Sequence, residues 1–463
     1  MKKNLSIVIL LISLAISQSV FSQTYSFEKG KVPEGWKIDK GVLHISSEKY
    51  KSGSRSLQIK WKQNAVLTIP SPTGISEACR NRNGGMNAWI YNESPTKENL
   101  LFSFRDETGK EVCQLPFLLD FKGWRCIWAK FQGDMNMSSK SNIQSVEIQF
   151  PQHTKKGVTY IDLLEFTSKV SWQNMSDAQY KVNRTDYSLI PDFIGYRNAT
   201  PKVEKVITAE DNQITTITNR LTTWYLGSGQ HSSERWIKMR TENEKTFIRN
   251  GVKAAQKIKI QYNEDHTPQG EPLFPMGAPS IIDGQEAKKF RSINENILLP
   301  LALDYRKNQN DQSLKKALYI YDWFNDQGWA DGSSMGTLCF EKLRSSGYFH
   351  SFFLLKEQLS PEQLKRELQT MNWFTMFGAC YQLPSHAGEV ADNLRALAIP
   401  KLIYALSQND KQEREVALTA FKHYMDNALG IAPGFFGTFK ADFSGYHHRG
   451  SYHSAYYPHA LYA

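Results

Sequence analysis

Cysteine is scarce in this sequence, with five residues among 463, and the number is odd. The five are Cys79, Cys113, Cys126, Cys339 and Cys380, and they include no Cys-x-x-Cys pair and no spacing typical of metal ligands. Their distribution argues against a zinc site and against a disulfide framework. Cys113 and Cys126 could pair across neighbouring strands, and buried free thiols are an equal alternative.

The N-terminus lacks an apolar run long enough to anchor the chain in a membrane, because the run from Leu5 to Ile16 is too short. Lys2 and Lys3 precede this run and a small-residue site ending at Ser22 follows it, which is the pattern of a secretory signal peptide. No cysteine stands at the cleavage point, which argues against a lipoprotein. We expect residues 1–22 to be a signal peptide and the mature protein to be exported, either periplasmic or secreted.

Acidic residues are outnumbered, since 46 Asp and Glu stand against 56 Lys and Arg, for a formal charge of +10. Loss of Lys2 and Lys3 with the leader lowers the charge to +8. In an exported protein a basic charge is not expected to serve nucleic-acid binding. It favours an acidic extracellular partner such as an acidic polysaccharide. The plain alternative is that the excess charge only keeps the protein soluble.

The mature chain exceeds the usual size of a single core, so two domains are expected. From residue 23 to about 170 the apolar residues alternate with polar ones, as Leu57, Ile59 and Trp61 do. Short apolar runs separated by turn signals predict an antiparallel β-sandwich. Its large rings are expected mainly in the core; the tryptophans are Trp36, Trp61, Trp89, Trp124 and Trp128.

The second part of the chain changes to a helical period. Residues 171–284 are predicted to form a connector and the first helices, and residues 285–463 a helical domain. Amphipathic segments occur at 314–329, 360–378, 390–410 and 413–430. Ser360 followed by Pro361 predicts a helix N-cap with proline at the first helical position. Strands first and helices second indicate two separate domains.

The segment FSGYHHRGSYHSAYYPHALYA, residues 443–463, concentrates titratable rings, with four of the 11 histidines and five of the 21 tyrosines. It follows a loop rich in glycine and aromatics, residues 429–445, where binding and catalytic groups tend to collect. The histidines offer a base near neutral pH and the tyrosines offer proton donors. A metal site is disfavoured because adjacent histidines point apart and no nearby acid completes a ligand set. Buried structural histidines are the main alternative.

Two further helical segments carry polar groups. Residues 331–355 place Glu341, Arg344 and His350 near aromatics, and residues 386–397 place Asn393 and Arg395 at the start of an apolar helix. Pattern alone favours a structural explanation for both segments. In the second, Asn393 is a helix cap and Arg395 is a solvated or paired surface charge.

Several motifs, in their order along the chain, resemble the chondroitin sulfate ABC lyases of polysaccharide lyase family 8. WIYNESP (89–95), LDFKGWRCIWAKF (119–131) and YIDLLEF (160–166) resemble the family's jelly-roll domain. RSSGYFHSFFLL (344–355) and HYMDNAL (423–429) resemble landmarks of its α/α-toroid, and HHRGSYHSAY (447–456) resembles its catalytic segment. The resemblance therefore implies a jelly-roll β-sandwich at residues 23–170 followed by an α/α-toroid.

The resemblance implies cleavage of chondroitin or dermatan sulfate by β-elimination, which gives unsaturated uronate products. Tyr456 matches the catalytic acid. The base is either His448, by its spacing to Tyr452, or His447, by its spacing to Tyr456, and His448 is favoured because the other motifs resemble the ABC branch. Asn393 resembles the residue that neutralises the substrate carboxylate. The ABC branch uses an upstream His instead, where this chain has Phe340-Glu341. We expect sulfate and uronate groups to be bound by residues near this segment, namely Arg344, Arg395, Arg449, Tyr452 and His453.

The chain also departs from the family pattern, because the helices and β-domains that supply a catalytic Arg and Glu have no counterpart before Ala463. We therefore expect a truncated toroid, and an inactive carbohydrate-binding protein is the first alternative function. A lyase for hyaluronate or another uronate polymer is the second. No cofactor is assigned, with a divalent cation such as calcium left open, and we expect a monomer.

Overall fold

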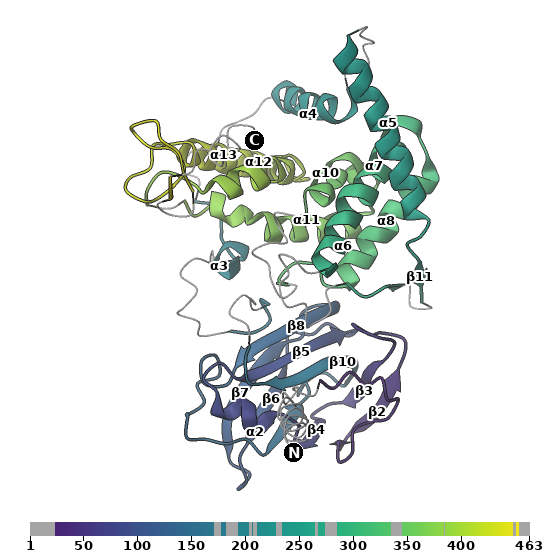
Figure 1. Cartoon of the computed structure of the whole chain (residues 1–463), viewed down its shortest axis with the longest axis vertical. Helices are drawn as coiled ribbons and strands as arrows, with labels where there is room; N and C mark the ends of the chain where they lie inside the picture. The colour runs from purple at the N-terminus through teal and green to yellow at the C-terminus, as the bar shows by residue number, and fades with distance from the viewer. Residues whose placement is uncertain are drawn as a thin grey trace, which may run out of the picture. The chain divides into compact units, whose positions relative to one another are not determined.

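The computed structural model describes residues 24–170, 177–181, 193–202, 206, 211–227, 234–263, 267–273, 285–334, 345–383, 385–447 and 451–452. The chain divides into two units, of which the first contains residues up to 184 except 123–125, and the second contains those three residues and the remainder. Strands dominate the first unit and helices the second (Figure 1). We call them the β-sandwich unit and the helical unit.

The β-sandwich unit contains two five-stranded antiparallel sheets. The first sheet has the order β1 (Lys37–Ile38), β4 (Val66–Pro70), β9 (Ser145–Gln149), β6 (Asn99–Arg105) and β7 (Glu111–Leu118). The second has the order β2 (Gly41–Ser46), β3 (Ser56–Lys62), β10 (Lys156–Thr167), β5 (Gly85–Asn92) and β8 (Gly123–Lys130). One short helix, α2 (Ile75–Arg80), belongs to this unit. The predicted β-sandwich is confirmed.

The alternation seen in the sequence places one side of each strand in the core. Leu57, Ile59 and Trp61 of β3 are buried with Phe102 of β6 and Ile148 of β9. All five tryptophans named above are buried, but only Trp36 and Trp61 belong to this core cluster. Burying a Leu, Ile or Phe side chain stabilises the fold by about 1.5–3 kcal/mol relative to leaving it exposed.

Cysteines in the described part of the chain are free and buried, at Cys79, Cys113, Cys126 and Cys380. Cys113 belongs to β7 of the first sheet and Cys126 to β8 of the second. The buried-thiol alternative is therefore correct, and the Cys113–Cys126 pairing is wrong. Burial raises the pKa of Cys113 to about 12, so its thiol stays protonated.

The helical unit consists mainly of consecutive helices (Figure 1). In chain order they are α3 (Phe193–Arg197), α4 (Asp211–Leu226), α5 (Arg235–Ala255), α6 (Gln285–Ile293), the π-helix η1 (Asn294–Leu298), α7 (Leu299–Asn308), α8 (Asp311–Asp326), α10 (Ser346–Leu355), η3 (Lys356–Gln358), α11 (Pro361–Thr375), η4 (Phe377–Cys380), α12 (Ala391–Leu406) and α13 (Lys411–Ala428). The described part of the unit also contains two short antiparallel strand pairs, β11 (Ile260–Tyr262) with β12 (Pro268–Gly270) and β13 (Tyr446–His447) with β14 (Ser451–Tyr452). All four amphipathic segments predicted from the sequence are helical.

Helix starts follow from local chemistry. Ser360 caps α11 through a capping box with Gln363, and Pro361 occupies the first helical position as predicted. Asp410 caps α13 by accepting from the amide of Glu413. Each such cap satisfies a backbone donor that the helix itself leaves open.

A buried lysine of the helical core is paired with backbone carbonyls. Lys401 of α12 is 1% exposed and donates from Nζ to the carbonyls of Thr375 (2.6 Å) and Met376 (2.7 Å). These carbonyls end α11, so the ammonium stabilises the negative end of that helix. The ring of Trp329 stacks on that of Phe374, with centroids 3.5 Å apart.

Candidate functional site

The hairpin β13–β14 contains two of the predicted site residues. Tyr446 pairs with Tyr452 and His447 pairs with Ser451 in an antiparallel register. The backbones of His447 and Tyr452 therefore lie on adjacent short strands. Predicted site residues that lie outside the described residues are Arg344, His448, Arg449, His453 and Tyr456.

Lys440 fastens the loop that leads to this hairpin. Its Nζ donates to the carbonyl of Gly434 (2.8 Å), to that of Phe436, and more weakly to that of Ala432 (3.4 Å). It also lies 4.9 Å from the ring centre of Tyr446. Desolvation lowers the pKa of Lys440. The ammonium thus stabilises the conformation of the loop by bonding three of its carbonyls.

Two glycines allow this loop to approach the segment before α12. Gly388 and Gly437 both have positive φ, of 108° and 65°. A Cβ added to Gly437 would lie 2.7 Å from Cα of Gly388 and 2.5 Å from Cβ of Ala432. Side chains at these positions would force the loop away from the start of α12.

Glu389 connects the start of α12 to α13. Its Oε1 accepts from the amide of Val390 (2.7 Å) and from Nδ2 of Asn393 (3.2 Å), and its Oε2 accepts from the hydroxyl of Tyr424 (2.9 Å). Burial, together with the nearby Glu389 carboxylate, raises the pKa of Tyr424 well above its usual value. The phenol therefore stays protonated and acts as a donor.

The same segment is bonded to the hairpin. Oγ1 of Thr438 donates to the carbonyl of Glu389 (2.5 Å), and the amide of Tyr446 donates to the carbonyl of Thr438 (2.9 Å). Since Asn393 donates to Glu389, a short hydrogen-bond path joins the start of α12 to the start of the hairpin. The fold thus brings Asn393 and the described start of the His/Tyr-rich segment into one corner of the helical unit, which we call the hairpin corner (residues 386–393, Tyr424, 429–447 and 451–452).

The two predicted site residues on α12, Asn393 and Arg395, differ in their surroundings. The helix N-cap is Val390, so the interpretation of Asn393 as a cap is wrong; its amide is instead held by the Glu389 carboxylate. Arg395 pairs with Asp392 at 3.1 Å and its side chain is 46% exposed. It is a paired surface charge, as the sequence pattern suggested.

An open hollow of about 510 Å³ lies beside the hairpin. Polar groups of Lys440, Asp442, Ser444 and Tyr446 line it, together with apolar residues from 431–434. The loop also exposes aromatic rings, since Phe443 is 92% and Phe435 68% exposed. The expected irregular surface connection at 429–445 is confirmed, and it provides an accessible surface next to the predicted catalytic segment.

The earlier segment around His350 forms part of the helical core. Nδ1 of His350 hydrogen-bonds the hydroxyl of Tyr225, and burial lowers the pKa of His350 to about 4. Tyr348 is fully buried and its hydroxyl donates to Glu367. These groups are neutral or paired members of the core, and neither lies in the hairpin corner.

Sequence reasoning missed Glu389 and Tyr424 as organisers of the corner. A carboxylate immediately before a helix N-cap was the available signal for Glu389, because such a charge favours the positive end of the helix. Among the described residues, no group of three or more His, Cys, Asp or Glu side chains is placed to hold a metal ion. None of the described helices is long and apolar enough to cross a membrane.

Comparison with protein families identifies both units. The model of the family described as "Lyase, N terminal" matches residues 21–182, and that described as "Lyase, catalytic" matches residues 200–461. The second match alone covers more than half of the chain and includes the whole hairpin corner.

Curated relatives are similar along most of the chain. A chondroitin sulfate ABC exolyase of Bacteroides thetaiotaomicron is 25% identical over 468 residues, which cover 92% of this chain and 43% of that protein. A chondroitin sulfate ABC exolyase of Proteus vulgaris is 20% identical over 467 residues, which cover 94% of this chain and 46% of that protein. The chain therefore spans less than half the length of either relative.

Proposed function

This chain belongs to polysaccharide lyase family 8, and from that premise we propose that it cleaves chondroitin and dermatan sulfate by β-elimination. The observation that carries the proposal is the hydrogen-bond path from Asn393 through Glu389 and Thr438 to the hairpin. That path connects Asn393 to the hairpin that contains His447 and Tyr452, which the family resemblance assigns to the same site although they are far from Asn393 in the sequence.

In the proposed reaction a base removes the C5 proton of a uronate residue and the C4–O4 bond breaks. A C4=C5 double bond forms, and an acid returns a proton to the departing O4 without addition of water. His448 or His447 would be the base and Tyr456 the acid. Asn393 would donate a hydrogen bond to the uronate carboxylate, so that the enolate that develops at C5 is stabilised as in an oxyanion hole.

Binding of the polymer would depend on arginine, tyrosine and histidine side chains. Sulfate and uronate groups are the expected partners of the residues assigned by the resemblance, which are Arg344, Arg395, Arg449, Tyr452 and His453. The hollow of about 510 Å³ beside the hairpin supports access of a chain-like ligand to this position. The export expected from the proposed leader would give access to an extracellular substrate, and the family match begins at residue 21, at the end of that leader.

The test is an ultraviolet assay for unsaturated uronate on chondroitin sulfate, dermatan sulfate and hyaluronate. We expect product from the native chain, and a loss of about 10²–10⁴-fold in His448→Ala or His447→Ala, whichever is the base, and in Tyr456→Phe. His423→Ala is the matched control, because His423 is exposed on α13 outside the corner, and it should retain full activity.

Circular dichroism of every variant separates loss of function from loss of fold. A folded native chain that yields no product on any of the three polymers would contradict the proposal, as would undiminished activity in Tyr456→Phe. Product from hyaluronate alone would correct the substrate and keep the reaction.

A further inference from the structure

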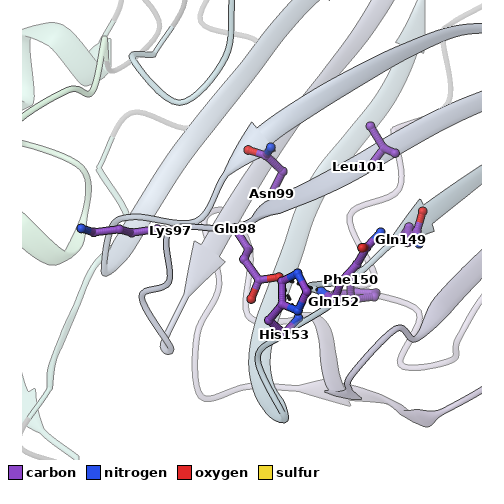
Figure 2. Close-up of a pocket in the computed structure, with 8 residues that line it drawn as sticks. All are labelled: Lys97, Glu98, Asn99, Leu101, Gln149, Phe150, Gln152 and His153. Carbon is purple, nitrogen blue, oxygen red and sulfur yellow. Dashed lines mark hydrogen bonds between the residues drawn. The ribbon is translucent and has the colours of Figure 1, made fainter.

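A second hollow lies in the β-sandwich unit, where β6 begins and β9 ends (Figure 2). Its volume is about 330 Å³, at the lower end of the range in which proteins bind small ligands. The polar residues that line it include Lys97, Asn99, Gln149, Gln152 and His153. Neither the family match nor the hairpin corner accounts for this collection of groups.

The strand register places three of the lining side chains on one face. Asn99 and Leu101 are two residues apart on β6, and Leu101 pairs with Gln149 of β9. Side chains alternate along a strand, so these three point to the side opposite the buried Leu100 and Ile148. The hollow is therefore a feature of the outer surface of the first sheet.

Glu98 makes the wall of the hollow rigid. Its carboxylate accepts from the amides of Gln152 (2.8 Å) and His153 (2.8 Å) and from Oγ1 of Thr154 (2.6 Å), contacts that Figure 2 shows in part. The Thr154 hydrogen bond is the main cause that lowers the pKa of Glu98, so the group is ionised at neutral pH. A wall fixed before binding spares a ligand the cost of ordering it.

The carboxamides of the hollow have no partner within the protein. In the part of the chain that the structure describes, no hydrogen bond is formed by the side chains of Asn99, Gln149 or Gln152, and no ion pair by Lys97. Each carboxamide offers donors and an acceptor, which suits the adjacent hydroxyls and amide substituents of a sugar ring. Leu101 and the buried Phe150 supply apolar surface beneath them.

The charges around the hollow favour an anionic ligand. Lys97 lines the hollow and is exposed, and its side chain extends away from the other lining residues in Figure 2. The exposed Lys155 and Lys156 follow the lining His153 by two and three residues in the sequence. Glu98, the one carboxylate among the lining residues, accepts hydrogen bonds from three donors within residues 152–154. We infer that this hollow binds an acidic sugar unit of a polysaccharide, as a second site separate from the proposed catalytic one. The identity of the polymer rests on the proposed function.

The test compares Gln149→Ala with Gln114→Ala in the full chain. Gln114 is an exposed residue of the same type on the same sheet, opposite Ser103 on β7, and does not line the hollow. Both changes are made in Tyr456→Phe, so that chondroitin sulfate stays intact whether or not the native chain cleaves it. Hydrogen exchange of residues 97–101 and 149–154 is followed as chondroitin sulfate is titrated, with dextran as the neutral probe.

We expect chondroitin sulfate to protect these two segments and dextran not to protect them. Gln149→Ala should raise the Kd read from this protection about five- to tenfold, in line with the loss of one or two hydrogen bonds, and Gln114→Ala should leave it unchanged. Absence of protection, an equal Kd in both variants, or equal protection by dextran would each overturn the inference.

The ultraviolet assay on the native chain separates this result from the proposed function. Protection that depends on Gln149 in a chain that forms no unsaturated product would retain the second site and reject the lyase. Product formation together with Gln149-independent exchange would reject the second site and retain the lyase.

Discussion

The side-chain carboxylates of Glu98, in the β-sandwich unit, and Glu389, in the helical unit, each accept three hydrogen bonds. The partners of the two carboxylates are of different kinds. The partners of Glu98 all lie within residues 152–154, a single turn. The partners of Glu389 lie on α12 and α13, and its own carbonyl receives the hydroxyl of Thr438 from the loop. One glutamate shapes a local turn, whereas the other holds three separate segments together.

The two glutamates also differ in the surroundings of their donors. Gln152 and His153 are exposed, so their amides can bind water if Glu98 is removed. Tyr424 is 3% exposed, so its hydroxyl cannot bind water if Glu389 is removed. A buried donor without an acceptor costs far more than an exposed one. The comparison therefore predicts a graded series of effects.

The largest effect is expected from Glu389→Ala. It leaves the buried hydroxyl of Tyr424 without its acceptor and releases Asn393, so the free energy of unfolding should fall by about 3 kcal/mol. Urea unfolding followed by circular dichroism measures this loss, and the ultraviolet assay should show lower activity. Glu362→Ala, at an exposed position in the first turn of α11, is the control and should cost far less. Equal losses of unfolding free energy in Glu389→Ala and Glu362→Ala would contradict the organising role given to Glu389.

An intermediate effect is expected from Tyr424→Phe. This change removes the buried donor together with its need for an acceptor, and Glu389 keeps its bonds to Val390 and Asn393. The free energy of unfolding should fall by about 1 kcal/mol in the same urea experiment. A loss as large as that of Glu389→Ala would show that the phenol, rather than the carboxylate, organises the corner.

The smallest effect is expected from Glu98→Gln, and it should depend on pH. Since the folded-state pKa of Glu98 lies below its unfolded value, the ionised group stabilises the fold above the unfolded pKa. That contribution is lost as the pH falls through the folded pKa. The thermal midpoints of the native chain and Glu98→Gln should differ most at neutral pH and converge in acid. A difference that grows on acidification would contradict the role given to the carboxylate.

Much of the fold could be predicted from the sequence because its signals are local. The alternation through Leu57, Ile59 and Trp61 identified a strand, and Ser360-Pro361 identified a helix start. Both patterns report on residues a few positions apart, where backbone geometry alone decides which side chains share a face.

The candidate site was less accessible to such reasoning. The His/Tyr-rich segment could be found by its composition, but Glu389 could not be assigned its role, because Tyr424 lies 35 residues away and Thr438 lies 49 residues away. Asn393 was misjudged for the same reason: its position suggested a cap, and its actual partner is set by how α12 meets the loop.

Local patterns in the sequence establish that strands come first and helices second, where individual helices are capped, and which segment is rich in proton-transfer groups. Periodicity and capping chemistry are encoded within one element, so they do not depend on the rest of the chain. The convergence of polar groups, at Glu389 and Thr438 in one unit and at Glu98 and Gln149 in the other, depends instead on how the elements pack. The physical reason is that hydrogen bonds need donor and acceptor within about 3 Å, and such distances between remote residues exist only after the elements have packed.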